Sequence, residues 1–174
     1  HRSLLTKLRY PVGKLHEDEF TTYQAIYSAK KIGAVNTIKN ENGKLLGYNT
    51  DYEGLKALVL KTKIDIKGKK SLILGSGGTA KTAYAVLSDL GASEIVRVSR
   101  DLSKADATYE GLLPKHSDAE FIINTTPVGM YPKNEGRIIN IGDFPCLKGL
   151  VDAVYNPIRS NLVLDARKKG IKAE

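Results

Sequence analysis

Apolar and polar positions alternate with a period of two over Ala34–Lys39, and a second short segment, Lys44–Tyr48, follows a few residues later. This alternation is typical of half-buried strands. Asn42-Gly43 lies between the segments, and this dipeptide is a strong signal for a two-residue hairpin loop. The pattern therefore predicts a β-hairpin in which Glu41 faces Lys44.

The same register places three polar side chains at one end of the hairpin. Asn36 stands opposite Asn49, and Asp51 follows just beyond the strand. Either Asn49 or Thr50 can cap a helix that we expect from Asp51 to about Leu60.

The rest of the chain alternates apolar runs with helical periods. Four buried strands are predicted, at Ser71–Leu74, Glu94–Ser99, Phe121–Asn124 and Gly149–Val154. One helix is expected from Thr79 to Leu90, with Gly91 as its stop, and another over Asn161–Lys169, ending at Gly170. Strands that alternate with helices predict an α/β fold with a Rossmann-type, doubly wound parallel sheet.

The segment Lys67–Lys70 is a polar connector, and we place a domain boundary there. Residues 1–66 then form one domain and residues 67–174 a nucleotide-binding domain. The first 33 residues have a weak pattern, in which Leu8–Gly13 is a candidate strand and turn and Glu17–Lys31 a candidate helix.

One connection in the second domain is short. Asp101–Glu120 spans twenty residues, whereas a βαβ unit takes about 30 residues or more. Either the sheet is abbreviated or sequence is missing there.

Composition excludes several classes of protein. The 174 residues are 41% hydrophobic and 26% charged, as in ordinary globular proteins, and no run approaches the roughly 20 apolar residues of a membrane span. Cys146 has no partner for a disulfide, and the first residues lack a secretory signal, so we expect a cytoplasmic protein. The net charge of +8 is scattered and there is no Trp, which argues against nucleic-acid binding. His1, His16 and His116 are too far apart for a metal site.

A glycine-rich loop carries the clearest chemistry. It follows the strand Ser71–Leu74, precedes a helix, and consists of Gly75, Ser76, Gly77, Gly78, Thr79 and Ala80. Gly75 permits a tight turn, Gly77 lets the backbone approach a pyrophosphate, and Ala80 allows close helix–strand packing. The free N–H groups of the helix start would hold the phosphates. The competing interpretation is a structural turn without a ligand.

The residues after the second strand indicate which dinucleotide is bound. Arg100 stands at the tip, beside Ser99 and one turn before Lys104, and an Arg at this place accommodates the 2′-phosphate of NADP. Asp101 offers an alternative, because it can turn inward and bind the ribose hydroxyl of NAD. Arg100 and Lys104 can also be two solvated surface charges.

Five motifs, in order, resemble the shikimate dehydrogenase family over about Lys30 to Glu174. They are Gly33-Ala34-Val35-Asn36-Thr37, Gly47-Tyr48-Asn49-Thr50-Asp51, the glycine loop, Ile123-Asn124-Thr125-Thr126-Pro127-Val128-Gly129-Met130 and Val154-Tyr155-Asn156-Pro157. Tyr10-Pro11-Val12-Gly13 also resembles the family's opening strand.

The resemblance implies an oxidoreductase that reversibly reduces 3-dehydroshikimate to shikimate with NADPH, in aromatic amino-acid (chorismate) biosynthesis. It makes residues 1–66 a partial substrate-binding domain, in which Asn36 and Asp51 contact the substrate, together with Tyr155. Asp51 would pair with a catalytic Lys that acts as general acid and base. The nicotinamide would be bordered by Thr125, Met130 and Ala153. We expect a monomer or homodimer with a small-molecule substrate.

Structural roles compete with these assignments. Asp51 can complement a helix N-terminus, Asn36 can satisfy hairpin backbone, and Tyr155 can pack in the core.

The sequence also departs from the family pattern. It lacks the H-S-x-S-P substrate loop after Gly13 and the V-T-x-P-x-K stretch that carries the catalytic Lys. Lys30 and Lys31 lie too close to the hairpin for that role. The sequence ends at Glu174, before the family's last strand and a helix with a substrate-binding Gln. We expect segments of the substrate domain and the C-terminus to be missing.

Three other functions stay open at this point. The first is a quinate/shikimate dehydrogenase that prefers NAD, and the second is a catalytically inactive NADP-binding module without the family Lys. A folate-linked Rossmann dehydrogenase is disfavoured by the motifs around Asn36 and Asp51.

Overall fold

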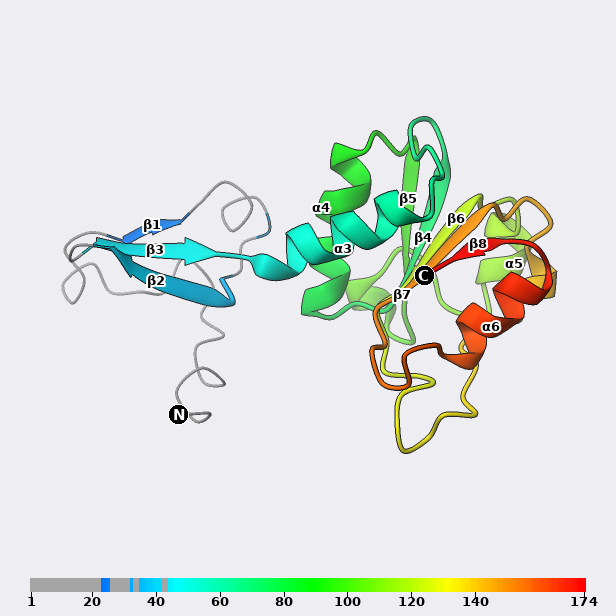
Figure 1. Cartoon of the computed structure of the whole chain (residues 1–174). Helices are drawn as coiled ribbons and strands as arrows, with labels where there is room; N and C mark the ends of the chain where they lie inside the picture. Colours follow the sequence, from blue (N-terminus) through cyan, green and yellow to red (C-terminus); the bar gives the residue numbers. More distant parts are fainter. Residues whose placement is uncertain (1–22, 26–31, 33–34, 42–43) are drawn as a thin grey trace. The chain divides into compact units, whose positions relative to one another are not determined.

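The computed structural model describes residues 23–25, 32, 35–41 and 44–174. The chain divides into two compact units, His1–Gly54 and Leu55–Glu174. Each unit is described by itself, and both are drawn in Figure 1. The functional boundary expected near Lys67 stays a prediction.

The first unit contains a three-stranded sheet in the order β1-β3-β2. Its strands are β1 (Tyr23–Ala25), β2 (Thr37–Glu41) and β3 (Lys44–Tyr48). The predicted hairpin is confirmed, because β2 and β3 pair antiparallel with Glu41 facing Lys44. The Asn36 N–H donates to the Tyr48 carbonyl at 3.0 Å, which continues the ladder toward Asn49. The turn at Asn42-Gly43 lies outside the described residues.

The helix expected over Glu17–Lys31 is wrong at Tyr23–Ala25, where the chain forms β1. This strand pairs parallel with β3, with Tyr23 opposite Leu45. Pairing with the second edge of β3 overrides the weak local pattern, as tertiary contacts often do for short segments. The remainder of the expected helix and the expected strand at Leu8–Gly13 lie outside the described residues.

Helix α3 (Thr50–Lys61) follows the hairpin, one residue longer at each end than predicted. Asn49 caps it, because its Oδ1 accepts from the Tyr52 N–H at 3.2 Å. Within the second unit the helix buries Leu55 and Val59, which lie on one face four residues apart.

The second unit is a parallel sheet in the order β5-β4-β6-β7-β8, drawn in Figure 1. The strands are β4 (Lys70–Leu74), β5 (Glu94–Val98), β6 (Phe121–Asn124), β7 (Gly149–Asp152) and β8 (Lys172–Ala173). The helices are α4 (Gly78–Asp89), α5 (Leu112–His116) and α6 (Asn161–Lys168), with short 3-10 turns η1 (Leu102–Lys104) and η2 (Ile141–Asp143). The predicted doubly wound, Rossmann-type sheet is confirmed.

Both faces of this sheet are buried, as its uninterrupted apolar strands predict. Alternate strand residues such as Leu72, Ile122 and Leu150 pack with Leu112 of α5 and Leu162 of α6. Helices α3 and α4 cover the opposite face (Figure 1).

That opposite face contains one close approach that requires glycine. A Cβ on Gly149 would lie 2.5 Å from Cε2 of Phe121 and 2.9 Å from Cγ1 of Ile64. The absent side chain at Gly149 makes room for the buried Phe121 ring.

The short connection after β5 is an abbreviated crossover. A single parallel bridge joins Val98 to Ala107 where a further strand would lie. Beside it, the Arg97 N–H donates to the Asp106 carboxylate at 2.9 Å, and the Asp106 N–H donates back to the Arg97 carbonyl at 2.9 Å. One aspartate thus takes over the backbone pairing that a neighbouring strand would supply.

The predicted strands and helices of the second unit differ from the observed ones by at most two residues at an end, whereas β2 begins three residues after the predicted start at Ala34. Strand β7 stops at Asp152 rather than Val154, because the Val154 N–H donates to the Asp152 side chain at 3.0 Å. Strand β8 was not predicted, since two residues carry no period. It pairs with β7 and gives the sheet one strand more than the four expected.

Candidate cofactor and substrate site

The carboxyl ends of β4 and β6 form the point where the strand order reverses. From β4 the chain crosses to β5 on one side, and β6 returns on the other. Thr125, directly after β6, holds the end of β4, since its N–H and its Oγ1 donate to the Leu74 carbonyl at 2.8 Å and 2.7 Å. Open α/β sheets bind ligands in the crevice at such a switch point.

The glycine loop lies at this point, directly after β4. The helix it opens, α4, has Gly77 at its N-cap in an extended conformation, and no side chain caps its first N–H groups. Ala80 is buried against the sheet, as its small size predicted. Uncapped N–H groups at a helix start, with the positive end of the helix dipole, suit a phosphate ligand.

Gly75 has a φ of +115°, and a Cβ there would lie 2.6 Å from Oγ1 of Thr125. We expect Gly75→Ala to lower the free energy of unfolding by about 1–3 kcal/mol, because an L side chain is strained in this region and would also displace Thr125. Gly78→Ala is the matched control, since a Cβ there meets nothing within 4 Å. Chemical denaturation of both variants checks the prediction, and equal stability of the two would contradict it.

The tip of β5 lies beside the glycine loop. The hydroxyl groups of Ser76 and Ser99 are 3.1 Å apart, which joins the loop to the strand end. Asp101 turns into its own 3-10 turn, where Oδ1 accepts from the N–H and Oγ of Ser103 at 3.0 Å and 2.7 Å. Its Oδ2 lies 3.3 Å from Nζ of Lys104. The Ser103 hydroxyl and then its N–H hold the pKa of Asp101 below the usual range.

These contacts bear on the choice between NADP and NAD. Both oxygens of Asp101 are engaged within the turn, which argues against their use for a ribose hydroxyl. Arg100 is exposed and forms no ion pair with any residue in the described part of the chain. The arrangement leaves the Arg100 guanidinium as the group able to meet a further negative charge.

The residues expected beside the nicotinamide follow β6 and β7. Ala153 donates its N–H to the Asn124 carbonyl at 2.9 Å, and Met130 donates its N–H to the Pro127 carbonyl at 3.1 Å. Both side chains are half-buried, as is that of Thr125.

Sequence reasoning missed a buried polar cluster beneath these residues. It consists of Asn124, Asp152 and Ser160, joined by hydrogen bonds from Asn124 Nδ2 to Asp152 Oδ1 at 2.9 Å and from Ser160 Oγ to Asp152 Oδ2. Burial raises the pKa of Asp152, while its hydrogen bonds act in the opposite direction. A polar residue directly after an apolar run, as at Asn124, was the signal available in the sequence.

Tyr155 is 81% exposed, which excludes the core-packing interpretation of this residue. It lines a pocket of about 370 Å³ together with Leu58, Ala153, Val154, Ile158 and Arg159. Its ring is therefore accessible to a ligand.

In the first unit, Asn36 contacts the end of the hairpin as the predicted register requires, while the gathering of Asn36, Asn49 and Asp51 at one site stays a prediction. Asn36 Oδ1 accepts from the Thr50 N–H at 2.9 Å and from the Thr50 hydroxyl at 3.2 Å. Thr50 lies between Asn49 and Asp51. Because its oxygen is engaged, Asn36 presents the Nδ2 group as its remaining donor.

Asp51 is exposed in the first turn of α3. Within residues 23–25, 32, 35–41 and 44–174, no lysine forms an ion pair with it. Lys30 and Lys31 lie outside the described residues.

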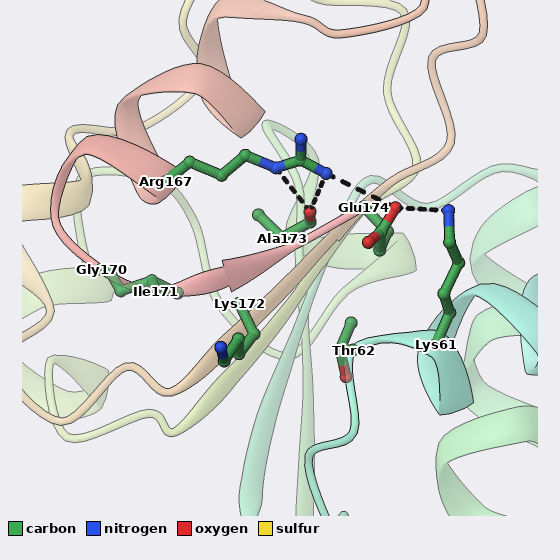
Figure 2. Close-up of a pocket in the computed structure, with 8 residues that line it drawn as sticks. All are labelled: Lys61, Thr62, Arg167, Gly170, Ile171, Lys172, Ala173 and Glu174. Atoms are coloured by element: carbon green, nitrogen blue, oxygen red, sulfur yellow. Dashed lines mark hydrogen bonds and ion pairs between the residues drawn. The ribbon is translucent and has the colours of Figure 1, made fainter.

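A second pocket, of about 460 Å³, lies beside β8 and contains none of the predicted site residues. Figure 2 shows Glu174 between Lys61 and Arg167, at 2.8 Å and 3.5 Å from their nitrogens. Arg167 also donates to the Ala173 carbonyl. Lys172 also lines this pocket, so three cationic side chains accompany the single Glu174 side-chain carboxylate.

Among the described residues, no three His, Cys, Asp or Glu side chains gather as metal ligands would. No helix of the described part is long and apolar enough to cross a membrane.

A parallel sheet with a glycine-rich turn and an uncapped helix start at its switch point is the architecture of the Rossmann class of α/β proteins, which bind dinucleotides at this point. The comparisons with known proteins narrow this class, although no family model matches the chain. The NADP(+) shikimate dehydrogenase of Clostridium perfringens strain 13 is 37% identical over 155 residues, covering 84% of this chain and 57% of that protein. The Clostridium beijerinckii enzyme is 41% identical over 138 residues, covering 74% and 50%.

Solved structures of similar proteins point to the same family as the sequence relatives. A chorismate mutase/shikimate 5-dehydrogenase fusion protein from Clostridium acetobutylicum superposes with a TM-score of 0.77 at 33% identity, covering 87% of this chain and 58% of that one. Shikimate 5-dehydrogenase from Thermus thermophilus, in complex with NADP(H) and shikimate, gives 0.74 at 28% identity, with 87% and 59% coverage. The resemblance drawn from the motifs is confirmed, and the chain is a homologue of the shikimate dehydrogenases. It spans 57% of the length of the Clostridium perfringens relative.

Proposed function

We propose that this protein is an NADPH-dependent shikimate dehydrogenase, which reversibly reduces 3-dehydroshikimate to shikimate in aromatic amino-acid biosynthesis. The observation that carries the proposal is the glycine loop at the switch point, with Arg100 at the neighbouring strand tip. The names of the relatives, NADP(+) shikimate dehydrogenases, support it.

On the cofactor side, the α4 N–H groups and the residues Gly75 to Ala80 would hold the pyrophosphate. Arg100 would meet the 2′-phosphate, with Lys104 adding positive charge and Ser76 and Ser99 lining the ribose. Arg suits this role because its planar guanidinium can donate two parallel hydrogen bonds to a phosphate.

NADPH, when bound, supplies the hydride that reaches the substrate carbonyl carbon. Thr125, Met130 and Ala153 would border its nicotinamide and exclude water from that end of the crevice. Thr125 and Ala153 directly follow the ends of β6 and β7, which pair side by side in the sheet, and Met130 lies in the loop after β6.

On the substrate side, Asn36 would donate from Nδ2 to a substrate hydroxyl, and the Tyr155 ring would line the pocket. Asp51 would hold a lysine ammonium charged and oriented, so that this lysine gives a proton to the nascent alkoxide. A positioned acid–base group of this kind contributes about 10²–10⁴-fold in rate.

An assay of the full-length protein tests the proposal. Shikimate-dependent reduction of NADP, followed by the absorbance of NADPH, should exceed the rates with quinate or with NAD. A higher rate with quinate and NAD would support the alternative quinate/shikimate dehydrogenase.

One observation favours a second candidate, a catalytically inactive NADP-binding module: no described lysine pairs with Asp51. Full-length protein that binds NADPH but turns over neither shikimate nor quinate would establish this candidate and exclude the enzyme.

We infer a cytoplasmic monomer or homodimer that acts on a small-molecule substrate, with no nucleic-acid or membrane partner. The scattered positive charge and the absence of an aromatic–basic stripe in the sequence support this view.

A further inference from the structure

The buried cluster of Asn124, Asp152 and Ser160 lies at the carboxyl ends of β6 and β7. Their exposed fractions are 0%, 5% and 1%. A buried carboxylate is costly unless hydrogen bonds satisfy its oxygens, and removal of one partner from such a group is strongly unfavourable. The geometry of these bonds points to what the cluster does.

One oxygen of Asp152 joins two segments that are far apart in the sequence. Oδ1 accepts from Asn124 Nδ2 at 2.9 Å and from the Val154 N–H at 3.0 Å. Asn124 is the residue before Thr125, and Val154 is the residue after Ala153. The same oxygen therefore sets the separation of the chain after β6 from the chain after β7.

The bonds continue into the loop after β6. Asn124 Oδ1 accepts from the N–H and the hydroxyl of Thr126 at 3.0 Å and 2.8 Å. The Thr126 hydroxyl in turn accepts from the Val128 N–H at 3.3 Å. The path of this loop toward Met130 thus begins at the Asn124–Asp152 pair.

The other oxygen of Asp152 is held by a helix cap. Ser160 Oγ donates to Oδ2 and accepts from the Val163 N–H at 3.3 Å, as the N-cap of α6. A hydroxyl can do both at once. Helix α6 therefore fixes the rotation of the Asp152 carboxylate.

We propose that Asp152 is a positioning residue, which sets the spacing of Thr125 and Ala153 on the two sides of the nicotinamide. This inference rests on the proposed cofactor site. The role concerns the nicotinamide end of the cofactor and not the adenosine end, because Asp152 is hydrogen-bonded to the segments after β6 and β7 and not to the glycine loop or the tip of β5. Loss of the Asp152 bonds should misalign the nicotinamide end and spare the adenosine end.

The role depends on hydrogen-bond geometry rather than on charge. An asparagine at position 152 keeps one oxygen for Asn124 and Val154, and its Nδ2 can donate to Ser160 Oγ. A leucine fills a similar volume and makes none of these bonds. Asp152→Asn is therefore the conservative variant and Asp152→Leu the disruptive one.

The experiment measures binding and turnover in the full-length protein carrying Asp152→Leu, Asp152→Asn, Ser160→Ala or Ser160→Thr. The probes are NADPH and 2′,5′-ADP, a fragment that contains the 2′-phosphate but no nicotinamide. We expect Asp152→Leu to lower kcat by about 10²-fold, since a shift of about 1 Å at the reacting centre has effects of this size. NADPH affinity should fall, whereas the affinity for 2′,5′-ADP should stay within about twofold of that of the unsubstituted protein.

Ser160→Ala should give a smaller loss of the same kind, which keeps the test valid if Asp152→Leu does not fold. Asp152→Asn and Ser160→Thr should retain kcat and NADPH affinity close to those of the unsubstituted protein. Parallel loss of NADPH and 2′,5′-ADP affinity would mean a general structural role and overturn the proposal, as would unchanged kcat in both disruptive variants. If the unsubstituted protein binds neither probe, the proposed function itself fails, and this inference falls with it.

Discussion

Asp51→Asn is expected to lower kcat for shikimate oxidation by about 10²–10⁴-fold, the range for loss of a positioned acid–base function. Asparagine matches aspartate in shape but has no charge to keep a neighbouring ammonium protonated and oriented. Affinity for NADPH should stay unchanged, because the glycine loop and the tip of β5 are untouched. Steady-state kinetics and NADPH titration of the full-length protein measure the two effects.

Glu53→Gln supplies the matched control for this variant. Glu53 is the other acidic residue in the first turn of α3 and is also exposed. Both substitutions remove one negative charge from a helix N-terminus, which costs about 0.3–1 kcal/mol of stability. If the two variants lose activity equally, Asp51 serves the helix and not the reaction.

Arg100→Leu is expected to weaken NADPH binding by about 10–100-fold, since hydrogen bonds to a charged group contribute about 1.5–3 kcal/mol each. NADH lacks the 2′-phosphate, so its affinity should change little. The measurement is a pair of titrations with NADPH and NADH for each protein. Equal losses for both cofactors would mean that the 2′-phosphate assignment of Arg100 is wrong.

Lys115→Leu controls for the overall positive field, which attracts anions without specific contact. Lys115 lies in α5 near the amino ends of the strands, where its carbonyl accepts from Nζ of Lys70 at the start of β4. This variant removes the same unit of charge far from the strand tips. It should change the two affinities by the same small factor.

Much of the fold was readable from the sequence because its signals are local. The Asn42-Gly43 signal, with the alternation before it, predicted the hairpin register, and the apolar runs marked four strands of the parallel sheet. Gly91 and Gly170 marked the helix ends, and both have positive φ values. Strands β1 and β8 were missed, because two or three residues become a strand through a partner elsewhere in the chain.

The candidate site likewise contains parts with a local sequence signal and parts that depend on a distant partner. The glycine loop and the tip of β5 are each a continuous stretch of sequence, so the sequence alone could propose them as a dinucleotide site, and that assignment stays a prediction. The contact between Asn124 and Asp152 joins residues 28 positions apart, and no local pattern reports it. The role of Asp101 was open in the sequence, since an aspartate can face a ligand or its own turn, and the geometry around Ser103 decides between them.

The aspartate beside Arg97 has a consequence for self-association. An uncovered outer strand is a template on which a second chain can extend the sheet, a route to dimers and to fibres. Asp106 occupies the N–H and carbonyl of Arg97 and forms an ion pair with its guanidinium at 2.9 Å. A copy of the protein that tried to add a strand beside β5 would have to displace both. Any homodimer of this protein should therefore be built on another surface, and Asp106→Ala is the substitution that would free the Arg97 N–H for a strand of a second copy.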